Sequence, residues 1–435
     1  MAVGALEVGH NSRVRWFDRH LSLLGGTTTA AECVVALRHL VRPDMMIQGA
    51  SIAAYEQAFA ARIGTRFAIS FAAGRVGLYG ILRALGIGRG DEVLLPAPTH
   101  IVVANAIRYT GARPVYVDCE VETFNIDLVE AASRVTPRTR ALILQHGFGI
   151  PVDLDLASEL AARGLVLIED CVHALGSTYH GRPLGAFGKA AFFSTEETKT
   201  TSTTMGGMVV TDDHELANSL RAFQSACSWP SRRLVARYLA KLLAYYGLTE
   251  PHVHRHARRL YERLGQRHPL PRPTTSAELR GKKPAAYEQR LSNAQAAVGL
   301  EQLRTLDANL AHRRRIAERY RGRLSERGVA VPQPPKGSEP TFVRYPVLVE
   351  NRAAAQHAVA AHAVLGTWFT SVLEEALSPA FGDYVDGSCP RAEMVARHLV
   401  NLPTHPRVEE DDADTIVDAL LNSPATPVRA ASGLS

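Results

Sequence analysis

The first half of the chain alternates short apolar runs with amphipathic segments, and this alternation constrains the fold more than any other feature. Seven runs have the length and composition of buried strands: 67–71, 92–96, 114–117, 141–145, 165–169, 190–194 and 207–211. Segments with helical spacing separate the first five: 77–85, 102–109, 128–135 and 153–163. Strands that alternate with helices in this way form βαβ units. We therefore expect an α/β fold with a mostly parallel seven-stranded sheet flanked by helices.

The 435 residues are enough for two or three domains. We expect an N-terminal extension over 1–40, a large domain over 41–310 and a smaller C-terminal α+β domain over 311–435. The spacing of apolar residues over 293–324 predicts one long helix.

Composition excludes several classes of protein. Apolar residues make up 46% of the chain and charged residues 21%, which excludes a disordered chain. No apolar run reaches the roughly 18 residues that span a bilayer, and residues 1–15 lack the pattern of a secretory signal. The five cysteines include no C-x-x-C pair, which favours reduced thiols over a disulfide framework or a zinc site. We expect a cytoplasmic protein without a bound metal.

A basic insert interrupts this mildly acidic body. Residues 228–283 contain 13 Lys and Arg against three Asp and Glu, a balance of +10 in a chain whose net charge is +6. Such a segment attracts phosphates, nucleic acid or an anionic membrane, or is simply a solvated surface. Its apolar helical face over 234–246 fits packing over a site or a partner subunit better than membrane binding. His252, His254 and His256 fit a flexible basic segment better than a metal site.

Three short motifs carry residues suited to chemistry. Asp170 ends a predicted parallel strand, where open α/β sheets bind ligands, and could serve as a helix cap, a metal ligand or a cofactor partner. Lys199 lies in a loop rich in Ser and Thr between two predicted strands. The small residues around Gly74 stand between a strand and a helix, where backbone N–H groups can approach an anion.

The order and spacing of these motifs resemble the DegT/StrS family of sugar aminotransferases, which are pyridoxal-phosphate (PLP) enzymes of fold type I. The resemblance covers about residues 48–420. The matching stretches are residues 85–93, Ala104-Asn105-Ala106-Ile107, Glu169-Asp170, Thr198-Lys199, Gly206-Gly207, Gln295-Ala296-Ala297 and Asn401-Leu402-Pro403.

The resemblance implies roles for four residues around the cofactor ring. Lys199 matches the lysine that forms the internal imine (aldimine) with PLP and then moves the substrate proton. Asp170 matches the carboxylate that pairs with the pyridinium nitrogen. His173 falls near the expected position of the ring oxygen, and His100 falls where an aromatic side chain commonly stacks on the ring.

The resemblance also implies a phosphate site at Gly74, Arg75 and Ser194, where Arg75 replaces the usual small hydroxyl residue. Two stretches depart from the family pattern. Glu288 stands where the family often has an Asn that reaches the phosphate of the neighbouring subunit, and we do not place it in the site. Trp368-Phe369 replaces a His-Tyr pair of the small domain, which leaves the sugar contacts open.

The resemblance thus implies a PLP-dependent aminotransferase that moves an amino group from L-glutamate to a keto-sugar, which we expect to be nucleotide-linked. We expect a homodimer that binds no nucleic acid. The basic insert, through Arg255, Arg258 and Arg259, is a candidate for holding a diphosphate. The alternatives are another PLP-dependent reaction, such as dehydration or elimination, and a non-catalytic regulator that binds PLP or a sugar.

Overall fold

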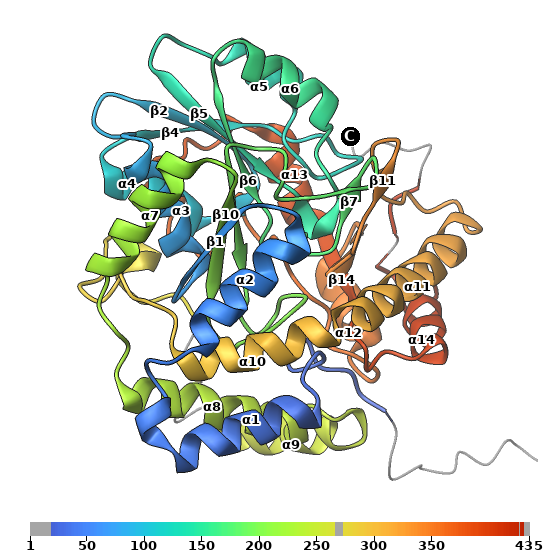
Figure 1. The fold of residues 1–435 in the computed structure, drawn as a ribbon. Coiled ribbons are helices and arrows are strands. Elements are labelled where there is room, and N and C mark those ends of the chain that lie inside the picture. Colours follow the sequence, from blue (N-terminus) through green and yellow to red (C-terminus); the bar gives the residue numbers. More distant parts are fainter. Residues whose placement is uncertain (1–18, 266–272, 426, 430–435) are drawn as a thin grey trace, which may run out of the picture.

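The computed structural model describes residues 19–265, 273–425 and 427–429. Its centre is a seven-stranded sheet, as predicted (Figure 1). The strands, in spatial order, are β1 (Phe67–Phe71), β10 (Gly207–Thr211), β9 (Ala190–Ser194), β6 (Val166–Asp170), β5 (Thr139–Gln145), β2 (Glu92–Pro96) and β4 (Arg113–Val117). Only β10 runs antiparallel to its neighbours, so the expectation of a mostly parallel sheet is confirmed.

Helices cover both faces of the sheet, which explains why its strands are almost continuously apolar. One face packs against α3 (Gly74–Ala84), α4 (Ile101–Thr110) and α7 (His214–Ala226). The other packs against α2 (Ser51–Ile63), α5 (Leu128–Ser133), α6 (Leu154–Ala162) and α10 (Asn293–Arg304). Strand β5 shows the alternation: Ala141 and Ile143 belong to the first core, Leu142 and Leu144 to the second.

The C-terminal part forms a separate core around two antiparallel strands, β12 (Arg344–Leu348) and β14 (Leu399–Pro403). The helices α11 (Leu306–Ser325), α12 (Arg352–Val359) and α14 (Glu410–Leu421) pack in this core, and α13 (Pro390–His398) joins it to the large sheet.

The prediction of one long helix over 293–324 is wrong. Thr305, at φ −98° and ψ 0°, leaves the helical conformation and separates α10 from α11. We retain the domain boundaries given above as a proposal.

The basic insert forms a layer beneath α10 (Figure 1). It contains α8 (Arg232–Leu248) and α9 (Pro251–Gly265), and α8 packs against α1 (Ala30–Val41) through Val235, Leu239 and Leu242. The expectation of a flexible segment around His254 is wrong, because this stretch is helical and His254 contacts His20. Residues 266–272 of the insert and 1–18 of the N-terminal extension, including the stretch examined for a signal, lie outside the described residues.

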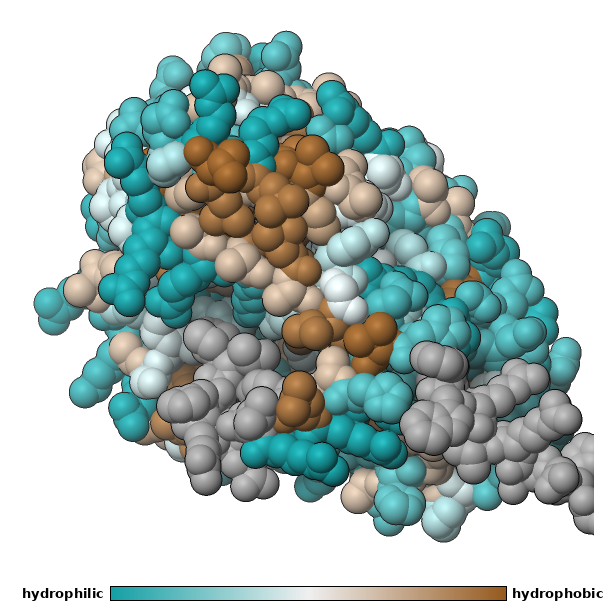
Figure 2. Space-filling view, turned by 90° about the horizontal axis from the view of Figure 1, so that it is seen from below, coloured by the Kyte–Doolittle hydropathy of each residue, from teal (hydrophilic) through white to brown (hydrophobic). Residues whose placement is uncertain are grey.

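The underside of the molecule carries a patch of hydrophobic side chains (Figure 2). The exposed large apolar side chains of this layer are Val34, Leu37 and Val41 of α1 and Tyr246, Leu248, Val253 and Leu260 of α8 and α9. None of the helices in the described residues is long and apolar enough to cross a membrane.

Short elements complete the fold. A parallel pair, β3 (Thr99–His100) and β13 (Leu373–Glu374), ties the large sheet to the C-terminal part. A three-stranded sheet is built from β7 (Thr178–Tyr179), β8 (Arg182–Pro183) and β11 (Ser338–Glu339). The 3₁₀ turns are η1 (Pro43–Met45), η2 (Gly147–Gly149), η3 (Glu278–Arg280) and η4 (Pro379–Gly382).

Candidate active site

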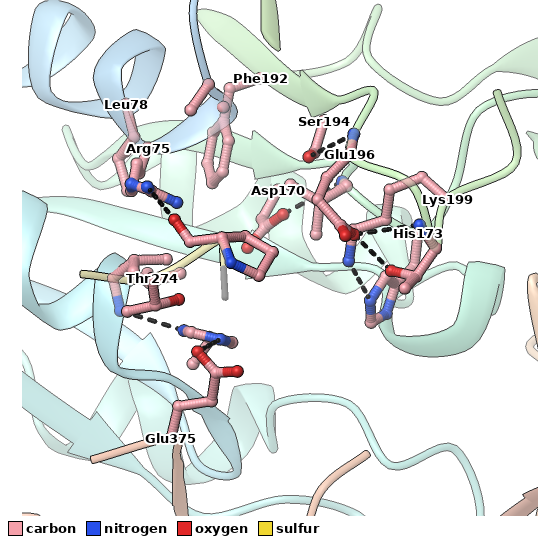
Figure 3. Close-up of a pocket in the computed structure, with 18 of the residues that line it drawn as sticks. Arg75, Leu78, Asp170, His173, Phe192, Ser194, Glu196, Lys199, Thr274 and Glu375 are labelled. Atoms are coloured by element: carbon pink, nitrogen blue, oxygen red, sulfur yellow. Dashed lines mark hydrogen bonds and ion pairs between the residues drawn. The ribbon is translucent and has the colours of Figure 1, made fainter. Parts of the chain in front are cut away.

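The seven residues that the sequence assigned to catalysis and cofactor binding line one cavity of about 230 Å³ at the carboxyl ends of the parallel strands (Figure 3), whereas Arg255, Arg258 and Arg259 of the basic insert do not. The seven are Gly74, Arg75, His100, Asp170, His173, Ser194 and Lys199. The C-terminal part closes the cavity with Trp368, Phe369 and Glu375. The roles that the resemblance implies for these residues remain predictions, but their convergence makes the cavity the candidate active site.

A tightly packed turn forms one end of the cavity. Ala73 is extended, at φ −159° and ψ 156°, and α3 begins at Gly74, so the first N–H groups of α3 have no acceptor within the helix. A Cβ on Gly74 would lie 2.9 Å from the carbonyl oxygen of Phe193. A Cβ on Gly207 would lie 2.3 Å from the backbone nitrogen of Gly74. Only glycine fits at these positions, and the resulting cradle of N–H groups suits a phosphate.

Arg75 is held beside this cradle by the basic insert. Its Nε pairs with Oε1 of Glu278 at 2.6 Å, and its Nη2 donates to the carbonyl oxygen of Pro273 at 2.8 Å. Glu278 is fully buried and accepts hydrogen bonds from the N–H and hydroxyl of Thr275. The role of Glu278 could not be recognised from the sequence. The Thr275-x-x-Glu278 pattern signals a helix start, but nothing in it points to Arg75.

Asp170 ends β6 at the centre of the cavity and is fully buried. Its Oδ1 accepts a hydrogen bond from the N–H of Val172 at 3.1 Å, whereas its Oδ2 has no hydrogen-bond partner. Burial raises the pKa of this carboxyl to about 7, although the Val172 N–H and the nearby Lys199 oppose the shift. An orphaned, buried carboxylate oxygen is costly unless a bound group donates to it.

Lys199 enters the cavity from the loop after β9. Burial lowers the pKa of its amine to about 8. The amine lies 3.2 Å from Nε2 of His173 and 3.9 Å from the centre of a Trp368 ring. Nδ1 of His173 accepts from the N–H of Phe148, which places the ring proton on Nε2 and directs it at a neutral amine. Burial, followed by the charge of Lys199, lowers the pKa of His173 well below its usual range. The lysine is therefore suited to act in its neutral form.

Trp368 is the side chain of the C-terminal part that lies against the Lys199 amine. Its ring stacks on His173, with ring centres 4.5 Å apart and planes inclined by 18°. The Arg344 guanidinium lies 3.8 Å from the centre of a Trp368 ring. The sequence marked Trp368 as a departure from the family pattern but gave no sign of this stack.

His100 caps the N-terminus of α4 and lines the cavity. Its Nδ1 accepts from the N–H of Val102 at 3.2 Å, and its Nε2 lies 3.3 Å from Oε2 of Glu375. Ser194, at the end of β9, accepts from the N–H of Glu196 at 3.3 Å through its hydroxyl. The two contacts of His100 fix its imidazole, so a flat ring lines this part of the cavity.

A second buried cluster beside Asp170 has a structural explanation. His146, Glu169 and Cys171 bring ligand atoms within 4.8 Å of one another. The oxygens of Glu169 already accept from His146 and from the N–H groups of Gly185, Phe187 and Gly188. Burial opposes ionisation, but these donors hold the pKa of Glu169 below its usual value. The cluster therefore fixes the loop after β8 onto β6.

Comparisons with known proteins find relatives along most of the chain. The DegT/DnrJ/EryC1/StrS aminotransferase family model matches residues 28–421. GDP-perosamine synthase from Caulobacter vibrioides is 31% identical over 378 residues, which cover 86% of this chain and 90% of the relative. The dTDP-3-amino-3,4,6-trideoxy-alpha-D-glucose transaminase of Streptomyces venezuelae is 31% identical over 395 residues, which cover 90% of this chain and 91% of the relative. The crystal structure of S. venezuelae DesV with a ketimine intermediate superposes on this chain with a TM-score of 0.71 at 30% sequence identity. The match covers 90% of this chain and 94% of the DesV chain.

Proposed function

Because this chain belongs to the DegT/DnrJ/EryC1/StrS aminotransferase family, we propose that it moves an amino group from L-glutamate to the keto carbon of a nucleotide-linked sugar. Enzymes of this family depend on PLP. The observation that carries the proposal is the meeting of Asp170 and Lys199 in one cavity: a buried carboxylate with an orphaned oxygen, and a buried lysine whose pKa is lowered to about 8.

The residues present fit the cofactor. The free Oδ2 of Asp170 suits the pyridinium N–H, and the turn at Gly74, with Ser194 and Arg75 beside it, suits the phosphate. When bound, PLP supplies an electron sink for the carbon that loses its proton. Asp170 sustains that property, because a buried carboxylate beside the ring nitrogen keeps the nitrogen protonated.

Lys199 is the proposed proton carrier. Its amine is neutral in an appreciable fraction of molecules near pH 8, so it can take a proton from the substrate carbon and return it to a neighbouring atom. His173 orients this amine through the 3.2 Å contact, and Trp368 shields it from water. Burial lowers the pKa of the lysine, and the contact with His173 fixes where the amine is held.

The test is the absorption spectrum of the purified protein with PLP, before and after L-glutamate. The expected result is a band near roughly 410–430 nm that moves to roughly 330 nm. Lys199→Ala should lose both responses, whereas Lys189→Ala, which removes a half-exposed lysine paired with Asp213, should keep them. A band that does not move when L-glutamate is added would contradict the assignment of glutamate as the amino donor. A wild type without any band would favour the non-catalytic alternative.

We also propose that the protein is a cytoplasmic homodimer. The absence of a membrane-crossing helix from the described residues is compatible with this location. Light scattering coupled to size exclusion would test the dimer directly: a monomer at micromolar concentration would contradict it.

A further inference from the structure

The loop that carries Lys199 connects β9 to β10 and is anchored on both sides of the lysine. After Lys199, the side chain of Asn309 in α11 donates to the carbonyl oxygen of Thr200 at 2.8 Å. The side chain of Gln302 in α10 accepts from the N–H of Ser202 at 3.0 Å. Helices α10 and α11 therefore hold the loop on the carboxyl side of the lysine.

On the amino side, the loop is held by the basic insert. Glu197, two residues before Lys199, pairs through Oε2 with Nζ of Lys241 at 2.5 Å, and its Oε1 accepts from the hydroxyl of Tyr245 at 3.4 Å. Lys241 and Tyr245 lie one turn apart on α8. In the part of the chain that the structure describes, they are the two polar partners of the Glu197 carboxylate. Helix α8 therefore anchors this side chain.

The Glu197–Lys241 pair crosses the wall between two cavities. Glu197 lines the candidate active site, whereas Lys241 and Tyr245 line a second cavity of about 820 Å³ between α8 and the turn before α3. The side chains of Glu197 and Lys241 are only 10% and 20% exposed, so their charges attract more strongly than charges on an open surface. Oε2 accepts no aligned hydrogen bond from any described residue. The attraction between the charges therefore holds the pair together.

Without Lys241, Glu197 would not keep this position. Burial, followed by the charge of Glu196, raises the pKa of Glu197, whereas Lys241 and Tyr245 oppose the shift. A carboxylate that loses its buried partner takes up a proton or turns to water. The loop would then lose its tether two residues before Lys199, and the lysine amine would lose its fixed position in the cavity.

We propose that α8 of the basic insert positions Lys199 through the Glu197–Lys241 pair. Lys241 does not line the catalytic cavity, so it acts through Glu197 and the loop and is a positioning residue. The inference rests on the proposed function for the reaction of Lys199 with PLP. It does not depend on the identity of the amino donor or of the sugar.

The experiment mixes apoprotein with PLP at pH 8 and follows the rate at which the band near roughly 410–430 nm appears. Lys241→Met should lower this rate constant about tenfold to a hundredfold, because a small misplacement of a reacting group slows its reaction steeply. Affinity for pyridoxamine phosphate, whose amine cannot bond to Lys199, should stay within twofold of wild type. Lys241→Arg restores the charge and should recover most of the rate.

Two further variants identify the pair as the cause. Glu197→Gln should slow the reaction as much as Lys241→Met, and the double variant should be no slower, because each change removes the same interaction. Lys189→Met is the matched control: it removes a lysine that pairs with Asp213 at the other end of β9, and it should react as wild type does. Far-ultraviolet circular dichroism verifies that each variant is folded.

The outcomes separate this inference from the proposed function. A rate constant within twofold of wild type in Lys241→Met overturns the inference. Equal losses of rate and of pyridoxamine phosphate affinity also overturn it, because the insert would then shape the whole cavity, as does a Lys241→Arg variant as slow as Lys241→Met. A wild type that forms no band overturns both. If the variants behave as predicted but L-glutamate does not move the band, the donor assignment fails and the positioning role stands.

Discussion

Replacing Asp170 with asparagine should stabilise the protein without its cofactor and destabilise it with PLP. In the apoprotein the carboxyl is fully buried and its Oδ2 has no donor, so burial raises its pKa to about 7 from 3.8. Between these two values the folded chain holds a proton at Asp170 that the unfolded chain has released. The free energy of unfolding therefore falls as pH rises through that window.

The structure fixes the size of the effect. A shift of about three units corresponds to about 4 kcal/mol of lost stability above pH 7, and about 2 kcal/mol of it is lost between pH 5.5 and pH 8. Asparagine keeps an acceptor for the Val172 N–H and cannot ionise. For a chain of 435 residues, 2 kcal/mol is about 2 °C in melting temperature.

The assay is thermal melting of apoprotein at pH 5.5 and pH 8, comparing Asp170→Asn with wild type. The difference between the two proteins should grow by about 2 °C in favour of the variant at the higher pH. Asp386→Asn changes an exposed carboxylate and should show no such growth. With PLP added, wild type should become the more stable protein. An equal difference at both pH values would refute the reasoning, since it would mean that the carboxyl titrates normally.

Three further predictions concern the surroundings of the site. Glu278→Gln should cost about 3 kcal/mol by leaving Arg75 without its buried counter-charge, and adding Arg75→Met should recover part of the loss in a melting experiment. Gly207→Ala should abolish the PLP band, because its Cβ would lie 2.3 Å from the backbone of the α3 turn, whereas Gly322→Ala has open space and should keep the band. Trp368→Ala should admit water to the lysine amine and raise its pKa from about 8, so the pH midpoint of PLP incorporation should rise.

Local pattern was enough to predict the sheet and the set of side chains that meet in the cavity. Each strand of the large sheet is a short apolar run, and parallel strands bring their carboxyl ends to one edge whatever the details of the connections. Asp170 at the end of β6 and Lys199 after β9 therefore had to lie near each other. The resemblance to the family supplied the roles expected of Asp170 and Lys199.

The contacts made by the insert could not be predicted in this way. Glu278 reaches Arg75 across about two hundred residues, and α8 packs on α1 and α10, which are distant from it in the sequence. Such contacts depend on how helices pack, not on spacing within one segment. The break at Thr305 is similar, since the apolar period continues through a residue whose ψ of 0° ends the helix.

The C-terminal part contributes electrostatics to the lysine as well as cover. Arg344 is buried and belongs to no ion pair within the described residues, and burial lowers its pKa to about 10. Its side chain passes Gly366, where a Cβ would lie 2.8 Å from Nη1. Lys199 and Arg344 both lie close to the Trp368 side chain, 3.9 Å and 3.8 Å from the centre of one of its rings. The charge of Arg344 therefore adds to burial in lowering the pKa of the Lys199 amine to about 8. Because β12 places Arg344, any motion of the C-terminal part relative to the large sheet changes the proton affinity of Lys199.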